Sequence, residues 1–210
     1  LDGSRPTLVS VDPVDGTTGV GLMPSIRFSF SEPLWPYGDD ALWRIVQISS
    51  PAGPISTGFR ASLDATRQVL TVEPTSPLAG ATLHEVRVPA SLRDRSLLDV
   101  GVDTFVRFTT ADLTNPAVVS SSPVAGQIQV PVLVNPAVVL SKAIDPATVV
   151  AGTHLRRVDA AGASVAIAPT LKADGRTIAF NPAANLEPEA EYEVVLDQVN
   201  DTAGNPLLAT

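Results

Sequence analysis

The chain has 210 residues without a single cysteine, so disulfide bonds and thiolate metal sites are excluded. Its 14 Lys and Arg residues stand against 22 Asp and Glu residues, a net charge of −8. This charge and the absence of a basic run argue against nucleic acid as a partner. No apolar run approaches the roughly 20 residues that span a bilayer, so we expect no membrane insertion.

Short segments rich in Val, Ile, Thr and Phe are separated by 19 prolines and 14 glycines. Proline interrupts nearly every window that could form a helix, and β-branched residues favour strands. The sequence therefore predicts an all-β protein. In the first half, alternating apolar residues between turn signals predict strands over residues 7–11, 25–30, 43–49, 55–61, 68–73, 82–88 and 104–109.

The second half repeats the pattern with one strand fewer. Strands are predicted over residues 117–121, 137–140, 154–158, 164–170, 177–181 and 191–196. A helical turn is predicted to begin at Pro146, with Asp145 as its N-cap. No counterpart of 104–110 is present before Thr210, so we expect an incomplete edge, covered by a partner chain or by a short strand over 207–210.

An internal repeat sets the architecture. Residues 6–16 align with 116–126 at an offset of 110, and residues 70–74 and 84–88 align with 178–182 and 192–196 at an offset of 108. A period of about 110 residues suits a complete β-sandwich. We expect one domain over residues 1–111 and a second over 112–210, joined by a short, semi-rigid linker near 111–115.

Several short motifs occur in a fixed order: the Pro-x-x-Val-Ser-x-x-Pro-x-x-Gly pattern of residues 6–16, Phe-Ser-Glu-Pro at 30–33, Leu-x-Pro-x-x-x-Tyr at 186–192 and Asp-x-x-Gly-Asn at 201–205. Together they resemble the bacterial Ig-like domain family, typified by S-layer proteins, in two copies that cover the whole chain. The first copy departs from the pattern, with His84 in place of Tyr192 and a longer loop over 91–103. The resemblance implies two immunoglobulin-like (Greek-key) β-sandwiches with an extracellular, non-catalytic role.

Residues for catalysis or metal binding are sparse. His84 and His154 stand alone on separate predicted strands, and no nucleophile, zinc or phosphate-loop motif occurs. The acidic loop residues lack the Asp-x-Asp-x-Asp spacing of a calcium loop, and we interpret them as turn and cap carboxylates: Asp12, Asp15, Asp39, Asp40, Asp99, Asp103, Asp197 and Asp201. We therefore expect no catalytic residues, no metal and no cofactor.

Aromatic residues gather in one segment of the first domain. Trp43 is predicted to be the buried residue of a central strand, by analogy with immunoglobulin domains. Trp35 and Tyr37 lie in the preceding loop, where they could contact a sugar ring or a protein. The second domain has no aromatic residue in the corresponding stretch 143–149.

Three functions remain open from the sequence. The leading hypothesis is a non-catalytic structural or spacer pair of a bacterial cell-surface or secreted protein, in an extracellular, surface or periplasmic location. The alternatives are a carbohydrate- or protein-binding module that uses Trp35 and Tyr37, and an accessory region of a larger extracellular enzyme. In each case we expect flanking domains in a longer parent protein, because the chain starts at Leu1 and not at methionine.

Overall fold

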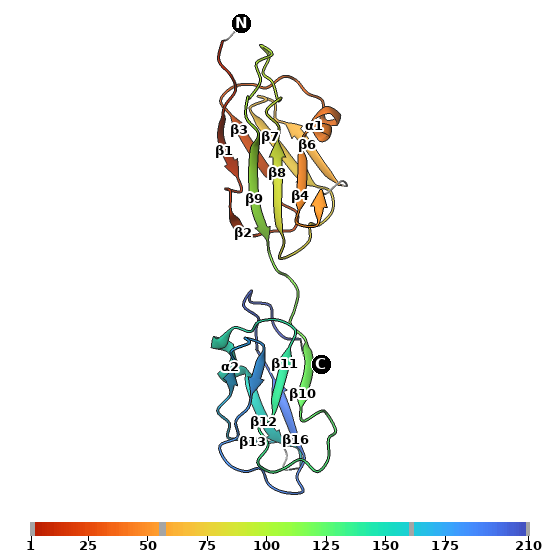
Figure 1. Cartoon of the computed structure of the whole chain (residues 1–210), viewed down its shortest axis with the longest axis vertical. Coiled ribbons are helices and arrows are strands. Elements are labelled where there is room, and N and C mark those ends of the chain that lie inside the picture. The colour runs from red at the N-terminus through yellow and green to blue at the C-terminus, as the bar shows by residue number, and fades with distance from the viewer. Residues whose placement is uncertain (1–2, 55–57, 160–161, 209–210) are drawn as a thin grey trace. The chain divides into compact units, whose positions relative to one another are not determined.

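A computed structural model describes residues 3–54, 58–159 and 162–208, except for the side chains of Asp40, Trp43 and Ile45. The chain forms two compact units, Leu1–Asp112 and Leu113–Thr210 (Figure 1). Each unit consists of two β-sheets and one short helix in its described part. The prediction of an all-β protein is confirmed.

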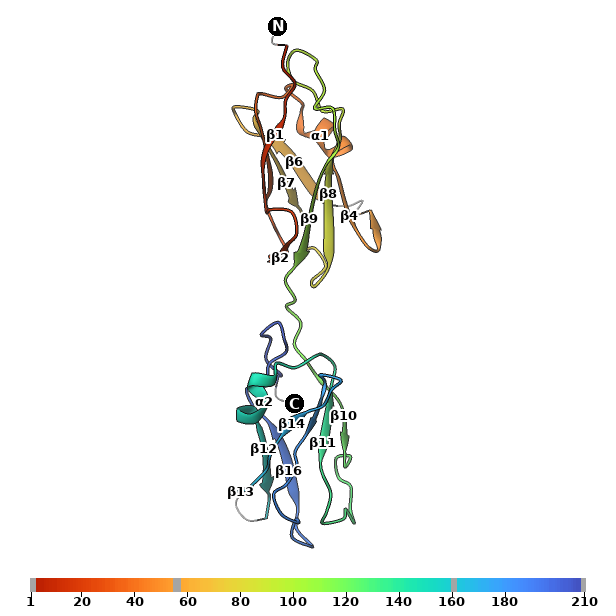
Figure 2. The ribbon, with the colours of Figure 1, turned by 60° about the vertical axis from the view of Figure 1, so that its left-hand side comes forward.

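The first unit is a sandwich of a four-stranded sheet, β1-β3-β7-β6, and a five-stranded sheet, β2-β9-β8-β4-β5 (Figure 2). Most neighbouring strands are antiparallel, but β2 and β9 run parallel. The elements are β1 (Leu8–Asp12), β2 (Thr17–Val20), β3 (Ile26–Phe30), α1 (Asp39–Ile45), β4 (Gln47–Ser50), β5 (Gly53–Pro54), β6 (Phe59–Leu63), β7 (Val69–Pro74), β8 (Leu83–Val88) and β9 (Thr104–Thr110).

Alternation along the strands builds the core of the first unit. On β3, Ile26, Phe28 and Phe30 point inward, and Val106 and Phe108 of β9 face them from the other sheet. All five are buried. Burying a side chain of this size stabilises a domain by about 1.5–3 kcal/mol, so these alternating residues hold the two sheets together.

The second unit has the same two-layer plan with shorter sheets, β10-β11-β15-β14 and β13-β12-β16. Its core contains Leu140, Leu155, Ile178 and Phe180, all buried. The elements are β10 (Val118–Ser122), β11 (Ala137–Leu140), α2 (Pro146–Gly152), β12 (Thr153–Arg157), β13 (Ala163–Val165), β14 (Thr170–Leu171), β15 (Thr177–Ala179) and β16 (Tyr192–Leu196).

The equivalent strands β8 and β16 differ in their neighbouring strands. β8 lies between β4 and β9, whereas β16 is hydrogen-bonded to β12 alone within the described residues. No named strand follows β16 in the described part of the chain. The expected strand over 207–210 lies partly outside the described residues. Its first residue, Leu207, donates its backbone N–H to Val199 O at 2.8 Å and therefore pairs with the segment that follows β16.

The prediction of one strand over 43–49 is wrong. Residues Asp39–Ile45 form α1, and β4 begins only at Gln47. Leu42 and Val46 are four residues apart and both buried, and Val46 N donates to Leu42 O at 3.0 Å. This helical spacing brings both side chains into the core, which outweighs the strand-like alternation of the same segment. Trp43 was predicted to be buried, but its side chain is not among those that the structure describes, so this stays a prediction.

The prediction of one strand over 164–170 is also wrong. It is divided into β13 and β14, with Ile167 making only an isolated bridge to Pro182. Pro169 has no N–H to donate to a ladder, which accounts for the interruption. Of the strand predicted over 55–61, residues 55–57 lie outside the described ones, and β6 begins at Phe59.

The helix predicted after Asp145 is confirmed as α2. The Asp145 side chain accepts a hydrogen bond from Ala147 N at 3.0 Å, and Pro146 occupies the first turn. Proline fits there because the first helical N–H groups have no partner within the helix. The helix ends at Gly152, where a Cβ atom would lie 2.2 Å from Asp197 O. Only glycine therefore fits at this end of the helix.

Candidate functional site

The segment with Trp35 and Tyr37 lies between the bridge residue Leu34 and helix α1. Trp35 donates its backbone N–H to Arg93 O at 2.8 Å, and the Tyr37 hydroxyl accepts from Arg93 N at 3.1 Å. These two bonds fix the segment to the loop before β9. The Arg93 guanidinium is bound to Asp99 at 2.6 Å, and this hydrogen bond and charge raise the pKa of Arg93.

The two predicted contact residues differ in exposure. Trp35 is 42% exposed, whereas Tyr37 is half-buried and packs against the core of the first unit. Tyr37 is thus partly used in holding the loop. Trp35 is the residue of this pair that presents an aromatic surface to solvent.

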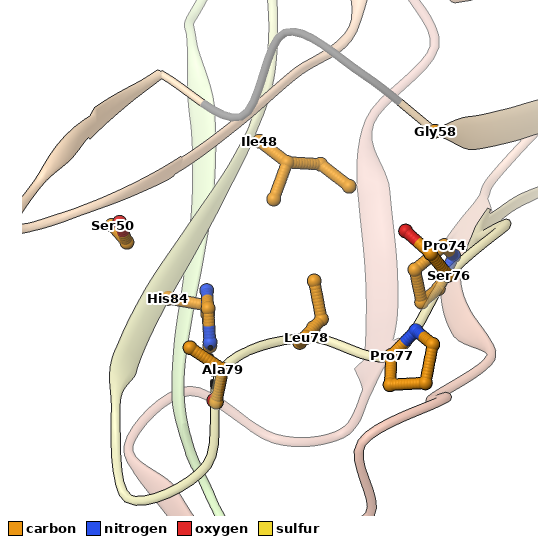
Figure 3. A pocket seen from close by; sticks show the side chains of 9 residues that line it. All are labelled: Ile48, Ser50, Gly58, Pro74, Ser76, Pro77, Leu78, Ala79 and His84. Atoms are coloured by element: carbon orange, nitrogen blue, oxygen red, sulfur yellow. Dashed lines mark hydrogen bonds between the residues drawn. The ribbon is translucent and has the colours of Figure 1, made fainter.

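A cavity of about 240 Å³ lies in the first unit at His84 (Figure 3). His84 is 1% exposed and its ring packs against Phe108, with 5.6 Å between the ring centroids. Its Nε2 lies 3.2 Å from Ala79 O, so this nitrogen carries the hydrogen and donates. Its Nδ1 is buried and has no hydrogen-bond partner among the residues that the structure describes. The described lining residues are Ile48, Ser50, Gly58, Pro74, Ser76, Pro77, Leu78, Ala79 and His84.

The cavity does not provide the arrangement of a hydrolase. General-base catalysis requires a nucleophile hydrogen-bonded to the histidine, and neither Ser50 nor Ser76 donates to Nδ1. Nor does an acidic side chain line the described part of the cavity. It could hold a water molecule or a small, mostly apolar group with one hydrogen-bond donor.

The second unit has Tyr192 at the position of His84. Its hydroxyl accepts a hydrogen bond from Glu187 N at 2.8 Å, and Glu187 aligns with Ala79 at the offset of 108. Both side chains therefore join the strand to the chain five residues earlier, as in a tyrosine corner. His84 has a structural role here, and His154 lies half-buried on β12 in the other unit.

Several of the acidic loop residues form side-chain bonds within their own unit. Asp15 accepts from Arg107 N at 2.7 Å, and Asp103 is bound to Arg87 at 2.6 Å. Hydrogen bonds from Ala90 N and then from Arg87 lower the pKa of Asp103. No group of three or more Asp, Glu, His or Cys side chains suited to a metal ion occurs among residues 3–54, 58–159 and 162–208.

Asp201 is buried and accepts several hydrogen bonds within the second unit. It is 1% exposed, and its carboxylate contacts Lys142 Nζ and accepts from the backbone N–H groups of Ala203 and Asn205 at 2.9 and 2.8 Å. Lys142 Nζ also donates to Thr114 O at 2.7 Å. Burial raises the pKa of Asp201, but the hydrogen bonds from Lys142 and Asn205 outweigh it, so the pKa is lowered overall.

The role of Lys142 was not anticipated from the sequence. Lys142 aligns with Glu32 at the offset of 110. Asp94 forms an isolated bridge with Leu34, and Asp201 forms the equivalent bridge with Ile144. The aligned repeat shows that a glutamate in the first unit is replaced by a lysine in the second. The role of this lysine could not be inferred, because its partner Asp201 lies 59 residues away in the sequence.

Comparison of the sequence with known protein families agrees with two repeated β-sandwiches. The bacterial Ig-like domain family matches residues 2–110 and again residues 112–210. The chain belongs to this family, in two tandem copies. The expectation drawn from the motifs of 6–16, 30–33, 186–192 and 201–205 is thereby confirmed.

Several solved structures are similar to the chain. They include native alpha-2-macroglobulin from Escherichia coli spanning domains MG0-NIE-MG1 (14% identity, TM-score 0.40, 92% of this chain and 61% of that one). Others are Rst D1-D2 (11%, TM-score 0.45, 97% and 95%) and surface layer protein SbsC, domains 1–6 (14%, TM-score 0.37, 99% and 34%). None of the curated protein sequences compared matches the chain. Within the described residues, no helix is long and apolar enough to cross a membrane.

Proposed function

We propose that the chain is a non-catalytic structural pair of domains that spaces or displays other parts of a bacterial cell-surface or secreted protein. Membership of the bacterial Ig-like family supports this role and an extracellular, surface or periplasmic location. The observation that carries the proposal is the parallel pairing of β2 with β9, with Thr17 opposite Phe108 and Val20 opposite Thr110. The pairing joins β2, near the start of the first unit, to β9, the strand that ends this unit.

This pairing suits a domain that carries tension. When the two ends of the first unit are pulled apart, β2 is drawn from its N-terminal side and β9 from its C-terminal side. Parallel strands loaded in this way slide lengthwise, so their hydrogen bonds resist together. Gly16 N to Arg107 O and Ala111 N to Val20 O, both 2.7 Å, extend the pair at its two ends.

Single-molecule force spectroscopy on the full chain tests the proposal. Each unit of about 100 residues should release roughly 3.3–3.6 Å per residue when it unfolds. We expect the first unit to open in one event at a higher force than the second, whose described part has no pair equivalent to β2 and β9. A chain in which the first unit extends without a discrete force peak would contradict a load-bearing role.

A second candidate function is binding of a carbohydrate or a protein through Trp35. The supporting observation is that Trp35 is exposed and that its backbone is held in place by the bond from Trp35 N to Arg93 O. An aromatic face on a fixed loop can stack on a sugar ring or anchor a protein contact. A role as an accessory region of a larger extracellular enzyme is compatible with either function.

A glycan array probed with the full chain distinguishes the two candidates. If binding through Trp35 is the function, the chain binds a defined glycan and Trp35→Ala abolishes that binding. Phe105→Ala is the matched control, because Phe105 is a comparably exposed aromatic residue on β9. Equal loss of binding in both variants, or binding that persists in Trp35→Ala, would contradict this candidate.

A further inference from the structure

Asp94 and Asp201 occupy the same place in the two units and are held by the same backbone bond. In each, Oδ1 accepts the N–H of the residue four positions later: Asp94 from Leu98 N and Asp201 from Asn205 N, both at 2.8 Å. Each also forms the isolated bridge described above. With Oδ1 held in the same way, the second oxygen, Oδ2, has the equivalent position in both units.

In the second unit an ammonium group lies at this second oxygen. Lys142 Nζ contacts Asp201 Oδ2 and donates to Thr114 O at 2.7 Å and to Thr114 Oγ1 at 3.2 Å. Three oxygens from two separate segments therefore surround one positive charge. The Lys142 side chain is only 23% exposed, so this charge is largely shielded from water and neutralises the buried carboxylate.

The first unit has oxygen-bearing residues at both of the other positions. At the offset of 110, Ser4 aligns with Thr114 and Glu32 aligns with Lys142. Serine offers a carbonyl and a hydroxyl oxygen, as threonine does, and glutamate brings a second carboxylate in place of the ammonium. The equivalent position in the first unit is therefore lined by oxygens and carries an excess of negative charge.

The backbone that carries these residues has the same geometry in both units. Thr7 N donates to Ser31 Oγ at 3.0 Å, and Ser31 N donates to Thr7 O at 2.9 Å. In the second unit, Ala117 N donates to Ser141 Oγ at 2.9 Å, and Ser141 N donates to Ala117 O at 2.8 Å. The residue after each serine, glutamate in one unit and lysine in the other, therefore starts from the same point of the fold.

Asp94 shows the effect of the missing ammonium. It is 1% exposed, and its Oδ2 is buried without a hydrogen-bond partner among the described residues. The neighbouring Arg93 binds Asp99 at 2.6 Å instead. A buried carboxylate oxygen without a partner destabilises the folded state, and a cation bound to it would remove this penalty.

We propose that Asp94, Glu32 and Ser4 form a calcium site in the first unit, where the ion takes the place that a lysine ammonium holds in the second. Asp94 Oδ2 and the Glu32 carboxylate would bind the ion directly. Ser4 would supply a carbonyl or hydroxyl oxygen, and water the remaining ligands. Calcium suits this set, because it accepts about six to eight oxygen ligands in a flexible geometry, whereas magnesium requires a near-ideal octahedron.

The spacing of acidic residues along the chain does not reveal such a site. Glu32 follows β3, whereas Asp94 lies in the loop before β9, so folding alone brings the two segments together. The site has two acidic side chains, fewer than the groups of three or more considered above. We therefore expect weak binding, with a dissociation constant on the order of 10⁻⁴–10⁻³ M, as in extracellular calcium modules. The proposal does not depend on the load-bearing role proposed above.

Calcium titration of the full chain, followed by NMR of the backbone amides at constant ionic strength, tests the proposal. We expect saturable shifts at Glu32, Asp94 and Leu98. The amides of Lys142 and Asp201 should stay unchanged, because the lysine already neutralises that carboxylate. Absence of a saturable shift at Asp94, shifts of equal size at Asp201, or an equal affinity for magnesium would overturn the calcium site.

Asp94→Asn removes one ligand charge and should weaken calcium binding about 10-fold or more. Asp99→Asn is the matched control, because Asp99 is an acidic residue of the same loop whose carboxylate is bound to Arg93. This control should keep the affinity of the wild type within about 2-fold. An equal loss in both variants would mean that calcium responds to the charge of the loop and not to a site at Asp94.

Glu32→Lys should give the first unit the arrangement of the second. We expect the calcium response at Asp94 to disappear and the melting temperature of the first unit in chelator to rise, because an ammonium then pairs with Asp94 Oδ2. A folded Glu32→Lys variant that binds calcium as tightly as the wild type contradicts the proposal.

Lys142→Glu is the reciprocal change and should give Asp201 a calcium response that it lacks in the wild type. If this variant unfolds the second unit in chelator, the response should appear as refolding when calcium is added. A second unit that ignores calcium in either form would contradict the equivalence of the two places on which the site is argued.

Discussion

Asp94 and Asp201 occupy equivalent places in the two units but have different surroundings. Both are 1% exposed. Asp201 is bound to Lys142 and to the turn that follows it. Asp94 accepts from Leu98 N at 2.8 Å, and its Oδ2 is buried without a hydrogen bond from any described residue. A buried carboxylate is stable when its oxygens are paired, so the two residues should respond differently to loss of charge.

Asp201→Asn should reduce the free energy of unfolding of the second unit by about 1–3 kcal/mol, because it weakens a buried, charge-assisted network. Asp94→Asn is the matched control and should cost less, since no lysine or arginine of the described residues is hydrogen-bonded to the Asp94 carboxylate. Urea unfolding of both variants at neutral pH measures the difference. A larger effect at Asp94 would contradict this account.

The same network predicts a dependence on pH. Because the pKa of Asp201 is lowered in the folded state, its contribution to stability is complete above the unfolded value of about 3.9. It is lost as pH falls below that value and through the folded pKa. The difference in stability between the wild type and Asp201→Asn should therefore shrink in acid, and a difference that grows there would contradict the assignment.

The two helices differ in their N-terminal caps. The N-cap residue of α2 is Asp145, whose side chain accepts from Ala147 N, whereas the N-cap residue of α1 is Gly38, which has no side chain to cap the helix. A carboxylate at this position satisfies an N–H group that has no partner within the helix. This difference explains why α2 was predictable from the sequence and α1 was not.

Asp145→Ala should lower the stability of the second unit by about 1 kcal/mol, since it removes the cap of α2. Gly38→Ser is the complementary change, because it would supply a cap to α1 in the first unit. Thermal unfolding monitored for each unit gives the sign of both effects. No loss of stability in Asp145→Ala would show that packing alone holds α2 in place.

Much of the fold was predictable because strands such as β3, β7 and β8 carry a local pattern of alternating residues. α1 was missed because Leu42 and Val46 are directed by contacts with distant strands. The site was less predictable. The sequence indicated the aromatic segment, but the anchoring of Tyr37 by Arg93 N and the cavity at His84 depend on chain segments brought together only by folding.

At the scale of the whole molecule, each unit has its own buried core within the described residues. Phe108 and Phe180 are both fully buried, one in each core. Two separate cores are expected to unfold as two cooperative transitions. We therefore expect that a defect in one core leaves the stability of the other nearly unchanged.

Phe108→Ala and Phe180→Ala test this independence in the full chain. Each should remove about 3–5 kcal/mol from one unit through the cavity it creates. Differential scanning calorimetry should show one transition displaced in each variant, a different one in the two cases. Displacement of both transitions by either substitution would mean that the units unfold together.

The parallel pair of β2 and β9 also affects when the first unit can finish folding. Thr17 and Phe108 face each other across this pair although they lie far apart in the sequence. A long chain loop must close before they can meet, and contacts of this kind slow folding. We therefore expect β8 and β9, which are neighbours in the sequence, to pair before β2 joins them.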